Sequence, residues 1–293
     1  MSPPSGGLRT AALLRGEDLA LRVGVRDVPL PRPGEALVAV SWAGVPGCEI
    51  AGVVELCPGG EIPVGTLVVA GPGVSRASAA EYCGHCTVDV HRLVRCPGTL
   101  EPAIAVLAEP LALAVRALAE VPEEPGGVLL LGYGPLGALV HLEAQARWPR
   151  VSVEVVEPDA ARRRFALALG ADIGLPGRDR AWQLVVDTAR HPGSLAYALA
   201  ACADRGTVLV IGRDPDPAVP VHLTGLAERD LRLVGVTSAD RELRSAVARL
   251  EQDPDRFRPV VTEALLLDEA PERLSRLAEL PSVGKVVINP CPN

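Results

Sequence analysis

The stretch Val128-Leu-Leu-Leu-Gly-Tyr-Gly-Pro-Leu-Gly137 decides the fold of this chain, because it joins a buried strand to a glycine signature. The four aliphatic residues 128–131 predict a strand covered on both faces, and residues 138–147 predict the helix that follows it. Three glycines fit G-x-G-x-x-G: Gly132 for a tight turn, Gly134 for the approach of a pyrophosphate, and Gly137 for helix–strand packing. The stretch therefore predicts a βαβ unit whose helix N-terminus holds phosphate groups.

An acidic residue farther along the chain supports this interpretation. Residues 151–157 predict a second strand that ends at Glu157, about 20 residues after Gly137. An acid at this spacing accepts hydrogen bonds from ribose hydroxyls and repels a 2′-phosphate, which favours NAD(H) over NADP(H). Three arginines follow, Arg162, Arg163 and Arg164. They fit the solvated start of a helix, although one of them could turn in to hold a phosphate.

Composition and charge narrow the class of protein. The 293 residues suit about two domains, and 48% are hydrophobic but only 3% aromatic, so the cores are expected to be aliphatic. The net charge of −7 comes without a basic stripe, which argues against a nucleic-acid partner. The sequence shows no signal peptide and no membrane-spanning run, and its seven scattered cysteines fit a reduced, cytoplasmic protein.

Three regions of the chain differ in their pattern of elements. Residues 8–111 are β-rich, with strands expected at 8–14, 37–42, 50–56, 66–70 and 87–95 and a helix beginning at 103 and running to 118. Residues 112–238 alternate strands (184–187, 206–212, 231–236) with helices (159–169, 194–202). Residues 239–293 predict helices at 242–250 and 269–280 and a strand at 285–288 that rejoins the first region. The fold class is thus α/β, with a β-rich domain (1–111 and 239–293) and a doubly wound parallel-sheet domain (112–238).

The order of these motifs resembles the medium-chain dehydrogenase/reductase superfamily, which includes the zinc alcohol and polyol dehydrogenases. The resemblance covers nearly all of the chain and rests on residues 29–40, Gly47-Cys-Glu-Ile-Ala-Gly-Val-Val-Glu55, Ala108-Glu-Pro-Leu-Ala-Leu-Ala-Val-Arg-Ala117, 132–137, Val185-Val-Asp-Thr188, Arg205-Gly-Thr-Val-Leu-Val-Ile-Gly212 and Gly284-Lys-Val-Val-Ile288. It implies a GroES-like catalytic domain, a Rossmann domain that binds NAD(H), and a cleft between them. The expected cofactor contacts are Gly132, Gly134, Pro135, Leu136, Gly137, Glu157, Asp187, Thr188, Ile211 and Gly212.

The chain departs from the family at the catalytic metal. Family members with catalytic zinc carry a Cys shortly after Ala-Gly and a Gly-His-Glu tens of residues later, whereas here Ala43-Gly44 leads through Val45-Pro46 directly into Gly47-Cys48-Glu49. The segment with the first ligand and its proton relay is absent, and Cys48 replaces the His. Cys48, Glu49 and Glu109 would just supply three ligands. Alternatively, Cys48 is a small buried side chain and Glu109 bonds backbone at the domain junction. We expect a shortened form without the usual catalytic zinc.

A second cysteine cluster is Cys83-Gly-His-Cys86, with Cys96 nearby. It resembles a remnant of the family's structural-zinc lobe, but such a site needs four ligands. Alternatively, this segment simply begins the strand that leads to residues 93–94. Without a zinc relay, a general acid or base must come from groups near the cleft, and the candidates are Cys48, Glu49, His85 and His91.

These features predict an NAD(H)-dependent oxidoreductase that transfers hydride between nicotinamide and a secondary alcohol or ketone. The missing segment normally walls the substrate site, so a wider cleft and a bulky, natural-product-like biosynthetic substrate are expected. A redox-neutral enzyme (an epimerase, lyase or cyclase) and a noncatalytic nucleotide-binding relative are the alternatives. The aliphatic residues 231–236 suit an edge strand that pairs with its symmetry mate, so we expect a homodimer with no membrane partner.

Overall fold

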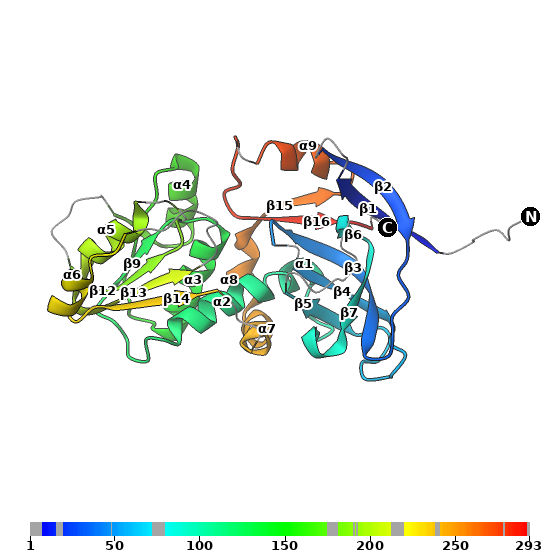
Figure 1. Cartoon of the computed structure of the whole chain (residues 1–293), viewed down its shortest axis with the longest axis horizontal. Coiled ribbons are helices and arrows are strands. Elements are labelled where there is room, and N and C mark those ends of the chain that lie inside the picture. Colours follow the sequence, from blue (N-terminus) through cyan, green and yellow to red (C-terminus); the bar gives the residue numbers. More distant parts are fainter. Residues whose placement is uncertain are drawn as a thin grey trace, which may run out of the picture. The chain divides into compact units, whose positions relative to one another are not determined.

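The computed structural model describes residues 8–15, 20–47, 49–71, 80–174, 181–189, 191, 193–211, 220–237, 241–277 and 279–291. The chain divides into two compact units (Figure 1). The β-rich unit comprises Met1–Glu109 and Ala246–Asn293, and the Rossmann unit comprises Pro110–Ser245. Among the residues with a described structure, no helix is long and apolar enough to span a membrane.

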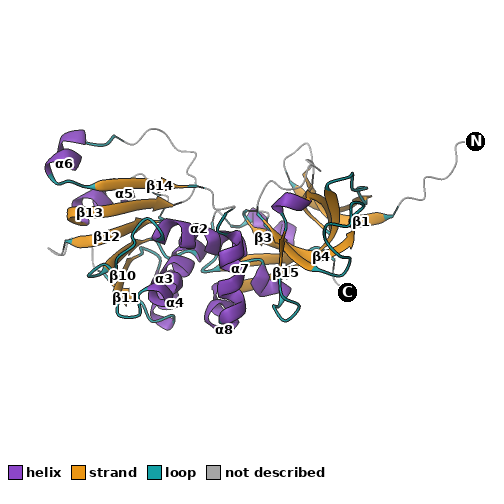
Figure 2. Cartoon of the chain, turned by 90° about the horizontal axis from the view of Figure 1, so that it is seen from below, coloured by secondary structure: helices purple, strands orange, loops and turns teal. Residues whose placement is uncertain are grey.

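The Rossmann unit is built on a parallel six-stranded sheet. Its strands are β9 (Val128–Leu131), β10 (Val153–Val156), β11 (Asp172–Ile173), β12 (Trp182–Asp187), β13 (Cys202–Ile211) and β14 (Arg232–Val236). They lie in the order β11-β10-β9-β12-β13-β14, and Figure 2 shows β12, β13 and β14 side by side. Counted within the sheet this order is 3-2-1-4-5-6, the order of dinucleotide-binding folds, with the topological switch point between β9 and β12. The predicted α/β fold class is confirmed.

Helices precede, connect and follow these strands. They are α2 (Ala108–Leu118), α3 (Pro135–Arg147), α4 (Ala160–Ala168), α5 (Ser194–Ala201), α6 (Leu223–Glu228) and α7 (Leu243–Gln252). The α4 helix begins where predicted, because the Asp159 side chain accepts a hydrogen bond from the Arg162 backbone N–H (2.8 Å) and caps the first turn. The predicted helix at 103–118 is wrong in one respect. It is two helices, α1 (Pro102–Ala105) and α2, separated by a turn at Val106 and Leu107.

The β-rich unit contains two sheets. A seven-stranded sheet has the order β15-β16-β3-β4-β5-β8, with β7 also paired to β3, and a three-stranded sheet has the order β2-β1-β6. The strands are β1 (Arg9–Arg15), β2 (Leu21–Asp27), β3 (Glu35–Val45), β4 (Ile50–Leu56), β5 (Leu67–Ala70), β6 (Ala80–Cys83), β7 (His85–Asp89), β8 (Val94–Arg95), β15 (Val261–Leu266) and β16 (Lys285–Asn289). As predicted, the strand at 285–288 rejoins the first region, because β16 pairs with β3.

Two other predictions for this unit are wrong. Residues 87–95 do not form one strand, because a 3₁₀ turn, η1 (Val90–Arg92), separates β7 from β8. The Asp89 carboxylate accepts the His91 backbone N–H (2.9 Å) and so favours that turn. The helix expected at 269–280 is the shorter α9 (Ala270–Ser275). The remaining short elements are α8 (Pro254–Phe257) and η2 (Arg258–Val260).

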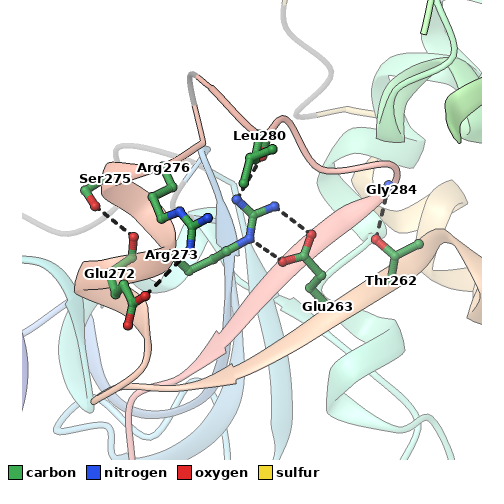
Figure 3. Close-up of polar contacts among 8 residues, drawn as sticks. All are labelled: Thr262, Glu263, Glu272, Arg273, Ser275, Arg276, Leu280 and Gly284. Carbon is green, nitrogen blue, oxygen red and sulfur yellow. Dashed lines mark hydrogen bonds and ion pairs between the residues drawn. The ribbon is translucent and has the colours of Figure 1, made fainter. Parts of the chain in front are cut away.

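An arginine clamp fixes the segment that leads from α9 into β16. Arg273 Nε and Nη2 donate to the two carboxylate oxygens of Glu263 (2.6 and 2.9 Å), and Nη1 donates to the Leu280 carbonyl (2.9 Å) (Figure 3). Close by, the Gly284 N–H donates to Thr262 Oγ1 (3.1 Å). Strand β15 and the entry to β16 are thus tied together immediately before Lys285.

Candidate functional site

The glycine loop between β9 and α3 has the geometry of a phosphate cradle. Gly132 has a φ of +84°, and a Cβ there would lie 2.8 Å from Ala189 Cα. A larger residue would therefore strain the backbone and collide with Ala189. A Cβ at Gly137 would overlap the Gly132 carbonyl oxygen. Gly134 precedes α3 and offers no capping side chain, which leaves the N-terminal N–H groups of the helix for an anion. These residues therefore fit a dinucleotide.

Glu157 is locked against this loop. Its Oε2 accepts the Tyr133 backbone N–H (2.7 Å), its Oε1 accepts the Asp159 N–H (2.9 Å), and the residue is only 7% exposed. Because each carboxylate oxygen has two lone pairs, one acceptor position per oxygen is left for ribose hydroxyls. The carboxylate is thus held at the tip of β10, beside the second residue of the signature.

The arginines after Glu157 differ in their surroundings. Arg163 Nη1 donates to the Glu157 carbonyl (2.9 Å), so this side chain is committed to the backbone at the strand end. The guanidinium carbon of Arg162 lies 3.9 Å from the point where a Cβ of Gly134 would stand. Arg162 is therefore the arginine that faces the glycine loop.

A buried aromatic pair, which the sequence did not reveal, supports the loop from beneath. Tyr133 and His141 are both fully buried, and Tyr133 Oη lies 2.7 Å from His141 Nδ1. The Tyr133 ring also contacts Phe165 edge-on, and burial raises the pKa of its hydroxyl. Tyr133, between the first two glycines of the signature, thus ties the loop to α3 and α4. An aromatic residue between two loop glycines, with a His eight residues later, is the signal that would have found it.

The remaining cofactor candidates lie at the carboxyl ends of neighbouring parallel strands. Thr188 Oγ1 lies 3.0 Å from the Leu131 carbonyl and 3.1 Å from that of Gly132. Asp187 accepts the Ser194 hydroxyl (2.6 Å) and the Ala189 N–H (3.0 Å), while burial raises the pKa of its carboxyl. Ile211 ends β13, and Gly212 lies outside the described residues. The described part of the site therefore lies at the carboxyl ends of the parallel strands, at the topological switch point.

In the β-rich unit, Glu49 is paired with Lys285. Its carboxylate lies against Gly44 and Gly47, and its Oε1 forms an ion pair with Lys285 Nζ. Both residues are buried, at 1% and 4% exposure. Cys48, between Gly47 and Glu49, lies outside the described residues.

Glu109 reaches the same end of the sheet. Its Cγ lies 3.3 Å from the point where a Cβ of Gly71 would stand, and Gly71 directly follows Ala70, the partner of Ile50. In this arrangement one carboxylate oxygen of Glu49, a candidate zinc ligand, is engaged by the Lys285 ammonium. Among the residues with a described structure, no three His, Cys, Asp or Glu side chains form a group that could hold a metal.

The other cysteine candidates are buried on neighbouring strands. Cys83 and Cys86 lie on β6 and β7 in the apolar core, which matches the alternative that this segment simply begins a strand. Burial raises the pKa of Cys86, and that of Cys96 to about 12, so both thiols stay protonated near neutral pH.

His85 bridges Thr10 (2.9 Å) and Glu55 (3.1 Å), and His91 is exposed on η1. His85 pairs with Ala39 of β3, whereas the Glu49 carbonyl accepts the Gly44 N–H. Ala39 and Gly44, the β3 residues beside His85 and Glu49, are about 16 Å apart at the rise of a strand. The catalytic roles of His85 and His91 stay predictions.

Comparison with known proteins agrees with the fold. No family model matches the chain. It is 28% identical over 201 residues to D-altritol 5-dehydrogenase of Agrobacterium fabrum (64% of this chain and 60% of that protein), and the match to a Bacillus subtilis L-threonine 3-dehydrogenase covers 66% of that relative. The chain thus spans less than two thirds of the first of these relatives. A longer match, 27% identical, covers 89% of the chain and 92% of L-threonine 3-dehydrogenase of Pyrococcus horikoshii.

Solved structures share the whole fold. A short chain alcohol dehydrogenase of Escherichia coli CFT073, solved with NADH, superimposes with a TM-score of 0.85 at 20% identity, covering 97% of this chain and 100% of that one. A protein of Sinorhizobium meliloti 1021 described as a zinc-binding dehydrogenase, solved with NADP, gives 0.84 at 20% identity over 96% and 99% of the chains. The fold is therefore a GroES-like domain with a Rossmann domain. In sequence the chain is similar to polyol and threonine dehydrogenases, in agreement with the resemblance to the medium-chain dehydrogenase/reductase superfamily that its motifs carry.

Proposed function

We propose that the protein is an NAD(H)-dependent oxidoreductase that transfers hydride between nicotinamide and the carbon of a secondary alcohol or ketone. The observation that carries this proposal is the glycine loop with Glu157 fixed beside it by two backbone N–H groups. The named relatives, all dehydrogenases, support the class of reaction. A small-molecule substrate and a cytoplasmic location belong to the same proposal.

The preference for NAD(H) follows from charge. A carboxylate at the tip of β10 accepts both ribose hydroxyls and repels a 2′-phosphate. Solved neighbours carry either NADH or NADP, so the choice depends on this chain's own residues. Arg162, which faces Gly134, supports binding of the cofactor diphosphate at the helix N-terminus.

When bound, the nicotinamide ring accepts or donates the hydride. The chain positions it: the glycine loop and α3 hold the diphosphate, Glu157 holds the ribose, and Asp187, Thr188 and Ile211 line the strand ends. We propose that catalysis proceeds without zinc, because Glu49 is engaged by Lys285. In the family, the segment that is absent here forms a wall of the substrate site. Its absence would leave room for a bulky, natural-product-like substrate.

A redox-neutral activity is the second candidate. The ion pair between Glu49 and Lys285 favours a redox-neutral activity, because it engages one candidate ligand of the metal that the usual chemistry needs. An epimerase, lyase or cyclase of this kind would oxidise its substrate transiently and keep its cofactor bound. A cofactor that stays bound and is not consumed during turnover would identify this case.

We also propose a homodimer that pairs β14 with its symmetry mate. Strand β14 is an edge of the six-stranded sheet, and its Leu233 is 38% exposed. Light scattering at micromolar protein concentration tests this assembly, and a monomeric mass refutes it.

Calorimetric titration of cofactor-stripped protein with NADH and with NADPH tests the main proposal. We expect tight NADH and weak NADPH binding, and at least a tenfold loss of NADH affinity in Glu157→Gln, since two backbone donors and the ribose share that carboxylate. Glu228→Gln, an exposed carboxylate on α6, is the matched control and should bind normally. Stronger NADPH binding would assign the phosphate to Arg162. Binding of neither cofactor would overturn the oxidoreductase proposal.

A further inference from the structure

The glycine loop carries a large side chain that the proposed cofactor contacts do not use. Tyr133 lies between Gly132 and Gly134, and it is the largest of the fully buried side chains that the structure describes. A loop of this kind approaches a dinucleotide through its backbone, whereas the Tyr133 ring is 0% exposed and packs into the Rossmann unit. The conformation of the loop does not require a side chain of this size, so the contacts of the ring indicate what it contributes.

Two helices hold the Tyr133 side chain. Its Oη lies 2.7 Å from Nδ1 of His141, which is in the middle of α3 and also 0% exposed. Its ring meets the Phe165 ring of α4 at 73°, with the centroids 5.8 Å apart, an edge-to-face arrangement that aromatic pairs prefer. Any displacement of Tyr133 would therefore break contacts with both helices.

The backbone of the same residue holds Glu157. The Tyr133 N–H donates to Glu157 Oε2 (2.7 Å), and Oε1 accepts the Asp159 N–H (2.9 Å). Asp159 caps α4, the helix that carries Phe165. One carboxylate oxygen is thus held by Tyr133 itself, and the other by the cap of the helix against which the Tyr133 ring packs. These contacts form a closed circuit around the carboxylate.

We propose that Tyr133 is the positioning residue that sets the preference of this chain for NADH over NADPH. A ribose hydroxyl must meet the Glu157 carboxylate at about 2.5–3.0 Å, and at about 3.6 Å the hydrogen bond is lost. The same carboxylate repels a 2′-phosphate most strongly when it stays at the tip of β10. Anchoring the loop therefore favours one cofactor and disfavours the other. This inference rests on the NAD(H) preference in the proposed function, and it names the side chain on which that preference depends.

A residue that only fills the core would behave differently. Lost packing lowers the population of folded protein, so it weakens NADH and NADPH binding by the same factor. Displacement of Glu157 weakens the binding of NADH, which uses the carboxylate, but not that of NADPH, which the carboxylate repels. The ratio of the two affinities therefore separates a positioning role from a packing role.

Calorimetric titration with NADH and with NADPH compares wild type with Tyr133→Phe, which keeps the ring and removes only the hydroxyl. We expect NADH affinity to fall about three- to tenfold and NADPH affinity to stay within about twofold, because the hydrogen bond that directs the ring is lost. Tyr82→Phe is the matched control. It removes the hydroxyl of another buried tyrosine, 4% exposed in the core of the β-rich unit, and should change neither affinity.

His141→Leu removes the same hydrogen bond from its other end. It should shift the ratio of affinities in the same direction as Tyr133→Phe, and it carries the test if Tyr133→Phe does not fold. The double variant should be no worse than either single one, since removing both polar partners of a hydrogen bond leaves neither of them unsatisfied.

A second cycle tests whether Tyr133 acts through Glu157. In the Glu157→Gln background, Tyr133→Phe should cause no further change in the ratio of NADH to NADPH affinity, because the charge that it positions has gone. Equal losses of both affinities in Tyr133→Phe, an unchanged ratio, or effects that add in the double variant would overturn the inference. A wild type that binds neither cofactor would overturn the proposed function as well, so the two failures are distinguishable.

Discussion

The two arginines of α9 and its C-terminal end give a matched test of what holds the β-rich unit together. Arg273 makes two hydrogen bonds to Glu263 and one to the Leu280 carbonyl, and its side chain is 22% exposed. Hydrogen bonds to charged groups contribute about 1.5–3 kcal/mol each when buried, and solvent reduces this in a partly exposed pair. We expect Arg273→Gln to lower the free energy of unfolding by about 2 kcal/mol.

Arg276 is the control. Its nearest contact, Nη1 to Glu272 Oε1, is 3.7 Å long between side chains that are 54% and 83% exposed, so Arg276→Gln should cost about 0–0.5 kcal/mol. Urea unfolding followed by circular dichroism measures both losses, and a double-mutant cycle with Glu263→Gln should show coupling of about 1 kcal/mol. Equal losses for the two arginines, or no coupling between Arg273 and Glu263, would refute the clamp.

Three further predictions concern other described residues. Gly137→Ala should weaken NADH binding at least about tenfold, because its Cβ would overlap the Gly132 carbonyl, whereas Gly225→Ala, with nothing within 4 Å, should bind normally; calorimetry compares them. Burial raises the pKa of Cys202 to about 11 and that of Cys96 to about 12, so at pH 8 both should alkylate at least about a hundredfold more slowly than exposed Cys291 in peptide-resolved labelling. Burial also raises the pKa of Asp187 above 3.8, so the protonated form is the one the fold favours. The contribution of protonated Asp187 is full below that value and is lost as pH rises through the folded pKa. Urea titrations should therefore show the advantage of wild type over Asp187→Asn shrinking as the pH rises above about 4, and a growing advantage would contradict this prediction.

Local patterns were predictable where neighbouring residues carry the whole signal. The glycine loop follows from backbone constraints at Gly132 and Gly137, and Glu157 follows from its spacing, so the amino-acid sequence alone places both. The role of Tyr133 was missed, because its contact with His141 forms only when α3 packs against the loop.

Contacts between distant segments explain the rest. The pairing of Lys285 with Glu49 depends on β16 lying beside β3, a register that no local pattern encodes. Strand β15 went unpredicted because the strand follows the short helical elements α8 and η2 directly, with no loop between them. The helix predicted at 269–280 is longer than α9. In the structure the Leu280 carbonyl accepts a hydrogen bond from the Arg273 side chain and not from a further helical turn.

The position of β16 also sets the order in which this chain can finish folding as it leaves the ribosome. Every strand of the parallel sheet precedes residue 245, whereas residues 43–45 of β3 lack their partner until β16, at residues 285–289, has been made. At about 5–20 residues per second, the intervening stretch takes roughly 2–9 s to synthesise. During that interval this end of β3 is available to other chains, and Glu49 has no ammonium beside it. The arrival of one short strand therefore ends both exposures at once.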